Sequence, residues 1–319
     1  MSSINFAILG DTSIANELGK KGTSSDITIH DKKTNENIIS YCFANTYPEK
    51  LQPLLQSVAM ADYAIINISK LDTFLGEQIV AAETLGIKNG FILHSYEVDP
   101  EKIKNIIKNT GLSSFVILDS LEELKAKISE MKPDEGDVKK SNDGQSSNAC
   151  VVVVDHAFDV KGVGTVILGT VKQGEIKTYD ELVLSPDDKP VLVKSIQMHD
   201  DPVTISKRPS RVGLAIKGVS AKDVSRGDII TSPGLAKIAN TDFQIKFIKN
   251  KYFKEEISET QNYMISVGLQ IRTVKVKQQP ESTLHISFEK PVAYLKNETC
   301  ILFRPDSKGM RIMGSGLLE

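Results

Sequence analysis

The residues with the clearest potential for chemistry follow an apolar segment at the start of the chain. The stretch reads AILGDTSIANELGKKG (7–22), with Gly10 between a strand-like run and a helix-like segment. A phosphate-binding loop here needs the pattern G-x-x-x-x-G-K-[ST], whose amides and lysine hold the phosphates. Ala15, Asn16 and Glu17 stand where the second glycine, the lysine and the hydroxyl residue belong. The spacing therefore predicts a structural turn.

The remaining reactive side chains form no recognisable site. Neither the histidines nor the cysteines have metal-ligand spacing, and no nucleophile has a base that the sequence reveals. The residues considered are His30, His94, His199, His285, Cys42, Cys150 and Cys300. We predict no catalytic residue and no metal site.

Composition indicates an ordinary globular chain of two or three domains. Of its 319 residues, 40% are hydrophobic and 25% are charged. We recognise no signal peptide, and no apolar run is long enough to cross a bilayer. The net charge is −6 over residues 1–148 and +4 over residues 149–319. We expect a cytoplasmic protein without a membrane partner, whose second half is better suited to an anionic partner.

Strand-like and helix-like segments alternate over residues 1–131, which predicts a doubly wound α/β domain. The expected strands are Asn5–Leu9, Asp26–His30, Ile38–Phe43, Tyr63–Ile68, Gly90–Leu93 and Phe115–Leu118. The expected helices are Ser13–Lys20, Pro48–Met60, Thr73–Leu85, Pro100–Asn109 and Leu121–Met131. The polar segment DKKTNEN (31–37) between two of the strands predicts a hairpin turn.

The pattern changes after a polar stretch. Residues 132–148 are rich in Ser, Asp, Lys, Gly and Asn and are typical of a linker. From Cys150 onward, short β-rich runs such as VVVVD, GTVILGTV and ELVLS are separated by turn residues. This predicts two β-barrels, over residues 149–234 and 235–319.

An α/β domain followed by two β-barrels resembles the translational GTPases. The resemblance is specific in AFDVKGVGTVILGTVKQGEIKTYDELVL (157–184) and in residues 193–234, which are similar to the second domain of elongation factor Tu and its relatives. The last domain matches more weakly, through SFEKPVAY (287–294), Arg304 and MGSG (313–316). The resemblance implies a P-loop-GTPase-like domain followed by elongation factor Tu domains 2 and 3.

The first domain departs from this family where a nucleotide would bind. The phosphate loop fails around Gly10 and Asn16, and residues 44–47 lack the carboxylate and glycine of the family's D-x-x-G. The guanine-reading N-K-x-D is replaced by HSYE (94–97), which contains Ser95 and Glu97. GTP hydrolysis needs cradled phosphates, Mg²⁺ and a positioned water. We therefore predict a degenerate, pseudo-GTPase domain without a cofactor, GTP and Mg²⁺ binding being the less favoured alternative.

The resemblance also implies an aminoacyl pocket, at Asp155, His156 and Arg211. This set resembles the selenocysteine-specific elongation factors of archaea and eukaryotes. A histidinium and an arginine favour an anionic selenolate, and an aspartate can orient the histidine. The alternative is a surface ion pair of little consequence.

Basic residues accompany aromatic ones in KFIKNKYFK (246–254) of the last domain. Backbone contact with RNA needs lysine and arginine, and the family grips tRNA with this domain. The predicted RNA-binding residues are Lys246, Lys249, Lys251, Lys254, Arg272 and Arg304. A solvated charged face is the alternative.

Together these features favour an elongation-factor-like protein that binds tRNA or aminoacyl-tRNA in protein synthesis, with the ribosome as a further partner and no role for DNA. The absence of a nucleotide signature favours action without GTP hydrolysis. Two alternatives stay open. One is a GTP-dependent elongation factor with a divergent nucleotide site, and the other is a non-catalytic module whose first domain docks a protein.

Overall fold

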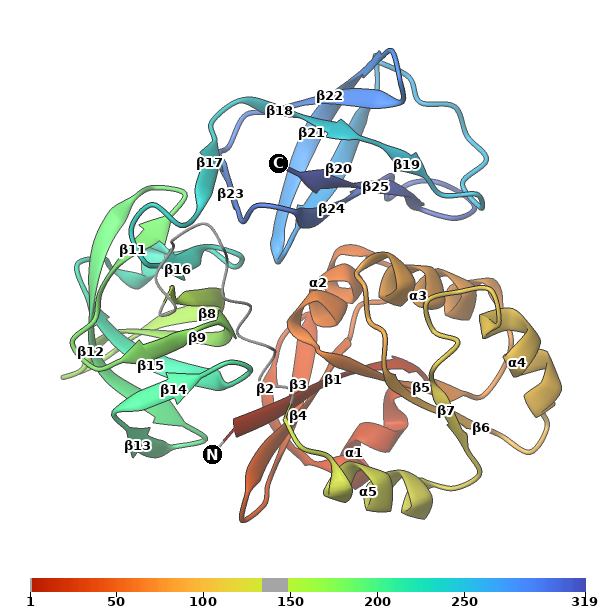
Figure 1. Ribbon diagram of the computed structural model, residues 1–319, viewed down its shortest axis with the longest axis horizontal. Helices are drawn as coiled ribbons and strands as arrows, with labels where there is room; N and C mark the ends of the chain where they lie inside the picture. Colours follow the sequence, from red (N-terminus) through yellow and green to blue (C-terminus); the bar gives the residue numbers. More distant parts are fainter. Residues whose placement is uncertain (1, 134–148) are drawn as a thin grey trace.

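The computed structural model describes residues 2–133 and 149–319, which form an α/β unit and two β-barrel units (Figure 1). Of the predicted linker 132–148, only residues 132 and 133 are among the described residues, and the rest of that prediction lies outside them. In Figure 1 the first barrel lies beside the α/β sheet and the second lies above helices α2 and α3. The fold class predicted from the sequence, a doubly wound domain followed by two barrels, is confirmed.

Seven strands form the first sheet in the order β2-β3-β4-β1-β5-β6-β7. The pairs β4–β1, β1–β5, β5–β6 and β6–β7 are parallel, and the pairs β2–β3 and β3–β4 are antiparallel. The strands are β1 (Ser2–Gly10), β2 (Lys20–Ser24), β3 (Ile27–Lys33), β4 (Asn37–Ala44), β5 (Tyr63–Ile68), β6 (Gly90–His94) and β7 (Val116–Leu118). The hairpin predicted at residues 31–37 is confirmed.

Helices cover both faces of this sheet, as in other doubly wound domains. Buried side chains of α2, α3 and α4 pack on one face, and those of α1 and α5 pack on the other. The helices are α1 (Ala15–Leu18), α2 (Gln52–Met60), α3 (Thr73–Thr84), α4 (Pro100–Ile107) and α5 (Leu121–Glu130). Polar caps begin three of them, since the side chains of Asp72, Asp99 and Ser120 each accept a backbone N–H of the first turn.

The predicted helix Ser13–Lys20 is wrong in length. A 3₁₀ turn at Thr12–Ile14 leads into only four α-helical residues, and the chain then enters β2, which the sequence did not predict. The ring Nδ1 of buried His30 lies 3.0 Å from the Ala15 carbonyl oxygen and 3.1 Å from that of Gly19. This contact satisfies carbonyls that a longer helix would have used.

Two antiparallel sheets follow, and each is accompanied by a short two-stranded pair. The first is closed by pairing of β11 with β12. Its elements are β8 (Val151–Val160), β9 (Gly164–Gln173), β10 (Glu175–Lys177), β11 (Glu181–Ser185), β12 (Lys189–Met198), β13 (Asp201–Val203), β14 (Ile205–Lys207), β15 (Arg211–Lys217) and β16 (Ile229–Thr231). Those of the second are β17 (Lys237–Ala239), β18 (Asp242–Lys246), β19 (Ile248–Lys249), β20 (Asn262–Val267), β21 (Gln270–Gln279), β22 (Thr283–Phe288), β23 (Val292–Tyr294), β24 (Glu298–Phe303) and β25 (Ile312–Leu318).

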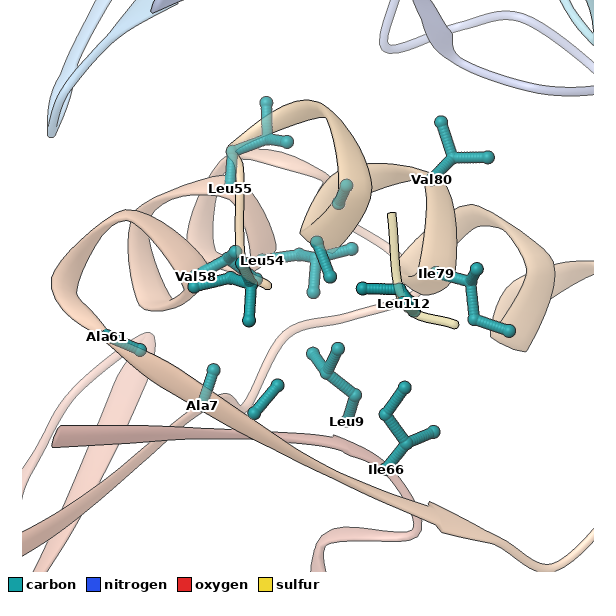
Figure 2. Packing of buried hydrophobic residues seen from close by; sticks show 14 of the residues in the cluster. Ala7, Leu9, Leu54, Leu55, Val58, Ala61, Ile66, Ile79, Val80 and Leu112 are labelled. Carbon is teal, nitrogen blue, oxygen red and sulfur yellow. The ribbon is translucent and has the colours of Figure 1, made fainter. Parts of the chain in front are cut away.

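Helices α2 and α3 have apolar side chains on two opposite sides. Figure 2 shows Leu54 and Val58 directed toward β1, whereas Leu55 and Val80 point away from the sheet. The same buried cluster continues into the second barrel, through Leu269, Ile301, Phe303 and Ile312. The first domain and the second barrel therefore share one hydrophobic core.

A buried ion pair lies within this shared core. The guanidinium of Arg311 donates to both carboxylate oxygens of Glu77 on α3, with Nε 3.0 Å from Oε2, and the Arg311 backbone N–H donates to Oε1 at 2.9 Å. Arg311 Nη1 also donates to the Pro48 carbonyl oxygen at 2.7 Å. The Glu77 side chain is 5% exposed and that of Arg311 is 10% exposed. Separation of the domains would leave one or both charges without these partners.

Helix α2 also contacts both barrels through a single side chain. The amide of Gln56 donates to the Leu269 carbonyl oxygen of the second barrel at 2.7 Å. Arg226, at the end of the first barrel, donates to the Gln56 side-chain oxygen at 3.3 Å and to Asp26 at 2.8 Å. The three units are thus joined around α2.

We predict that replacing Arg311 by Met lowers stability strongly. Removal of one partner from a buried ion pair costs about 3–5 kcal/mol, because the other charge stays buried without compensation. The change is read from the melting temperature and from the onset of protease cleavage between domains. The double variant E77L/R311M should regain much of the loss, since neither charge then remains.

Arg304→Met is the matched control. Arg304 is also paired with carboxylates, at 2.6 Å from Glu255 and 3.0 Å from Asp306, but these partners are solvent-accessible. Surface pairs contribute about 0–1 kcal/mol, so this variant should melt close to the wild type. If Arg304→Met and Arg311→Met lowered the melting temperature equally, the buried pair would be no more important for stability than a surface pair, which would contradict the prediction.

Candidate functional site

The turn after β1 is closed by contacts within the protein. The Gly10 backbone N–H donates to the side-chain oxygen of Gln78 on α3 at 2.8 Å. Gly10 has φ +77°, and a Cβ atom there would clash with the Asn67 carbonyl oxygen. Glycine is therefore required for close approach of β1 to β5, and the hydrogen bond of its amide to Gln78 ties this turn to α3.

The next residues also lack the features of an anion site. The Asp11 carboxylate accepts the Ser13 backbone N–H at 2.9 Å, which places a negative charge where phosphate would lie. Asn16, at the position of the expected lysine, is exposed, and its amide lies 3.5 Å from the Ser13 carbonyl oxygen. A helix of four residues offers little dipole to an anion.

Ser95 and Glu97 lie on a different loop, after β6. The Ser95 backbone N–H donates to the Ile68 carbonyl oxygen at 2.9 Å, which fixes the loop to β5. Glu97 is exposed and accepts the hydroxyl of Tyr96, whose side chain is 94% exposed. The four predicted nucleotide-site residues, Gly10, Asn16, Ser95 and Glu97, thus lie at the same end of the sheet. Each has its own hydrogen-bond partners, and the hydrogen bonds described above do not join the four into one site.

Asp155, His156 and Arg211 do come together. The Arg211 guanidinium donates to both oxygens of Asp155, one of them at 3.1 Å, and the His156 ring Nδ1 lies 2.7 Å from Asp155 Oδ1. Asp155 and His156 lie at a β-bulge in β8, not at a strand end, and Arg211 begins β15. The Arg211 backbone N–H donates to Ser3 Oγ at 3.1 Å, so the trio borders the first domain.

Charges in the trio are unequally accessible. The Asp155 side chain is 3% exposed, that of Arg211 14% and that of His156 25%. Burial alone would raise the pKa of Asp155, but the charge of Arg211 and the hydrogen bonds outweigh burial and hold that pKa below its usual value. Arg211 is therefore committed to Asp155, and His156 is the member that can meet a ligand.

Four of the predicted RNA-binding residues share one region of the second barrel. Lys246, Lys249, Lys251 and Lys254 are exposed along β18, β19 and the turn that follows. Within the described parts of the chain, none of the four forms an ion pair with a carboxylate. Of the neighbouring aromatic residues only Tyr252 is exposed, and the Lys251 ammonium lies 5.0 Å from its ring centroid.

Arg272 and Arg304 are placed differently. Arg272 donates to the Pro291 carbonyl oxygen at 3.1 Å, and burial lowers the pKa of this guanidinium. Arg304 is held by Glu255 and Asp306. Both arginines are occupied within the protein. The four lysines are exposed, and two of them also contact backbone carbonyl oxygens, Lys249 that of Glu255 at 3.3 Å and Lys254 that of Lys251 at 3.0 Å.

Several residues that define the domain contacts were missed from the sequence. Gln78 and Glu77 are polar residues inside the apolar run of α3, and Arg311 directly precedes the buried residues of the last strand. A buried charge within an apolar segment is a signal for a distant partner. The sequence does not say which partner, because Glu77 and Arg311 are separated by 234 positions.

Comparison with known proteins agrees with the observed architecture. Residues 164–231 match the family model for elongation factor Tu domain 2. Over 100% of both chains, this chain is 33% identical to an uncharacterized protein of Methanocaldococcus jannaschii. It is also 25% identical to the selenocysteine-specific elongation factor of that organism, over 79% of this chain and 57% of the relative. The chain belongs to the elongation factor Tu superfamily.

Within this superfamily the relationship is to the selenocysteine-specific factors. The fold resembles translation elongation factor SelB from Methanococcus maripaludis in complex with the GTP analogue GPPNHP, with a TM-score of 0.81 and 22% identity over 100% of this chain and 79% of that structure. Elongation factor 1-alpha of Archaeoglobus fulgidus is 22% identical over 72% of this chain. The chain spans only about three fifths of the length of these sequence relatives that are named as elongation factors.

Neither a membrane-crossing helix nor a metal-ligand cluster occurs in the described residues. No helix there is long and apolar enough to cross a membrane. In residues 2–133 and 149–319, no group of three or more His, Cys, Asp or Glu side chains is arranged to hold a metal ion.

We predict that Asp155→Asn destabilises the junction of β8 and β15. The substitution leaves the buried Arg211 without its counter-charge, at a cost of about 3–5 kcal/mol. Because the folded-state pKa of Asp155 is lowered, its contribution is complete above the ordinary carboxyl pKa of 3.8 and is lost as the pH falls through the folded-state pKa.

Melting temperatures measured between pH 3 and pH 7 test this. Wild type and Asp155→Asn should differ most near pH 7 and should converge at low pH. A difference that does not depend on pH would contradict the assignment of an ionised Asp155.

Proposed function

We propose that this chain is a translation factor paralog that binds aminoacyl-tRNA through its two barrels and works without a GTP cycle. The observation that carries the second part is the contact of the Gly10 amide with Gln78. In a phosphate loop the backbone amides of this turn cradle the phosphates. Here the turn is instead held by a side chain of α3.

Electrostatics support the same conclusion. Phosphate groups need cations or free amides, whereas the turn after β1 presents the Asp11 carboxylate and the neutral Asn16. No cofactor is therefore proposed. Release of a bound tRNA would then depend on a partner, such as the ribosome, or on simple dissociation, rather than on hydrolysis.

Isothermal titration with GTP and with GDP, each with Mg²⁺, tests the nucleotide claim. We expect no saturable binding up to about 1 mM, which corresponds to less than about 4 kcal/mol of binding free energy. Micromolar, magnesium-dependent binding would instead favour a GTP-dependent elongation factor with a divergent site.

The RNA-binding part rests on the four exposed lysines of the second barrel. Lysines that lack carboxylate partners can release counterions when they meet a phosphate backbone. We expect the quadruple change of Lys246, Lys249, Lys251 and Lys254 to Ala to weaken aminoacyl-tRNA binding at least about tenfold. The slope of the logarithm of the tRNA-binding constant against the logarithm of the salt concentration should become less steep by roughly 2 to 4. Fluorescence anisotropy with aminoacylated and deacylated tRNA measures both.

A matched variant controls for net charge. Changing Lys102, Lys108, Lys125 and Lys127 to Ala removes the same four charges from α4, α5 and the residue after α4. This control should bind as the wild type does. If both variants lose affinity for tRNA equally, binding depends only on net charge, and the second barrel has no specific tRNA-binding surface. If wild-type protein binds neither form of tRNA, the protein-docking alternative is favoured.

For the aminoacyl pocket we propose that His156 provides the preference for an anionic aminoacyl group. A protonated imidazole beside Asp155 attracts an anion, and Arg211 supports it indirectly by orienting Asp155. Replacing His156 by Gln should reduce several-fold the preference for selenocysteyl-tRNA over seryl-tRNA and leave seryl-tRNA binding unchanged. If the ratio of the two tRNA affinities did not change, the proposal that His156 forms part of an aminoacyl pocket would be wrong. Removal of Arg211 is less informative, because it would leave Asp155 buried without its counter-charge.

A further inference from the structure

A cavity of about 170 Å³ lies between the carboxyl ends of β1 and β4 and the helices α2 and α3. Cavities of about 150 Å³ admit a six-membered ring. Its lining residues are Ile8, Gly10, Thr12, Ala44, Asn45, Tyr47, Leu54 and Gln78. The space is thus bounded by the turn whose phosphate-binding features have been lost.

No lining residue of this cavity carries a formal charge. The polar members are a hydroxyl, two side-chain amides and the Tyr47 phenol, and burial raises the pKa of Tyr47, which keeps the phenol protonated. An anion would be desolvated here without a cation to compensate it. The lining therefore disfavours phosphate and carboxylate ligands and is compatible with uncharged ones.

Hydrogen-bonding groups are arranged on several sides of the cavity. The Asn45 amide donates to the Ser25 carbonyl oxygen and to the Thr28 hydroxyl, both at 2.6 Å, and the Gln78 oxygen accepts from Gly10. Asn45 Oδ1 is left as an acceptor, and Gln78 Nε2, 3.5 Å from the Phe74 carbonyl oxygen, is left as a donor. The Thr46 hydroxyl, between two lining residues, is buried and has no hydrogen-bond partner among the described residues. The ring of Tyr47 and the side chains of Ile8 and Leu54 supply apolar contact.

We propose that this cavity binds a small, uncharged, planar molecule that bears an amide-like edge, such as a carboxamide-substituted aromatic ring or a free base. Asn45 is exposed, which gives such a molecule a route from solvent. The aromatic ring packs against Tyr47 and the apolar side chains. Its amide edge donates to Asn45 Oδ1 and accepts from Gln78 Nε2.

The site is directly connected to the domain contact. The Tyr47 hydroxyl donates to the Phe74 carbonyl oxygen at 2.7 Å and to Glu77 at 3.2 Å. The Arg311 guanidinium lies 5.4 Å from the Tyr47 ring centroid. A molecule in the cavity would therefore contact the residue that covers the Glu77–Arg311 pair, and its binding should stabilise the joined arrangement.

Nicotinamide and nicotinate are matched probes, since they have the same ring and size but differ in charge. In ligand-observed NMR titrations we expect nicotinamide to bind in about the millimolar range, as suits so small a ligand. Nicotinate should bind at least about tenfold more weakly. Equal binding of the two, or no saturable binding of nicotinamide, would overturn the proposal.

Two further measurements locate the binding. Ala44→Leu fills the cavity and should abolish nicotinamide binding, whereas Ala126→Leu, on the exposed side of α5, should not change it. In ¹⁵N-labelled wild-type protein, nicotinamide should shift the Gly10 amide and the Gln78 side-chain signals, which keeps the test valid if Ala44→Leu does not fold. Shifts confined to other residues would place the binding elsewhere and overturn the assignment.

Discussion

The arrangement of the first domain and the second barrel depends on the buried pair of Glu77 and Arg311. Two opposite charges are removed from water at the place where α3 meets the last strand, and each obtains almost all of its hydrogen bonds from the other unit. Such a pair adds little net stability compared with apolar residues of similar size, but it strongly disfavours any state in which one charge is buried alone. It therefore specifies one way of joining the first domain to the second barrel.

Helix α2 is held as a consequence. Its apolar residues face both the sheet and the second barrel, and Gln56 connects it to both barrels. In the superfamily that this chain belongs to, the resemblance places a γ-phosphate sensor directly before this helix, at residues 44–47. Here that segment has no acidic residue, and the helix is fixed by protein contacts. The absence of the phosphate-loop pattern after β1 and the contacts of α2 with both barrels agree with the proposal that this factor works without a nucleotide.

Much of the fold follows from local patterns. Tyr63–Ile68 was predicted with its observed bounds, because a buried parallel strand is a continuous apolar run with clear ends. The strand Thr283–Phe288 alternates partly buried and buried residues, which is the pattern of a half-buried strand. The helix after Gly10 was predicted too long. The chain enters β2 at Lys20, and His30 of β3 contacts the end of the short helix. The helix propensity of residues 13–20 does not depend on that contact, so the sequence pattern alone does not reveal it.

The candidate site was only partly predictable for the same reason. The resemblance was sufficient to bring Asp155, His156 and Arg211 together, and the structure adds that Arg211 is neutralised by Asp155. For the basic residues, type alone could not separate exposed Lys246 from Arg272, whose guanidinium binds a carbonyl of its own barrel. Burial and partners decide which cations are accessible, and both are properties of the assembled chain.

Hydrogen exchange at the backbone amides of α2 tests the account most directly, because it reports whether that helix is held without nucleotide. In nucleotide-free protein, the account predicts slow exchange at Gln56 and Ser57, similar to that of the central strands, with no change when GTP and Mg²⁺ are added. Fast exchange that becomes slow only after GTP is added would show that a nucleotide, rather than the buried contacts, holds the domains together.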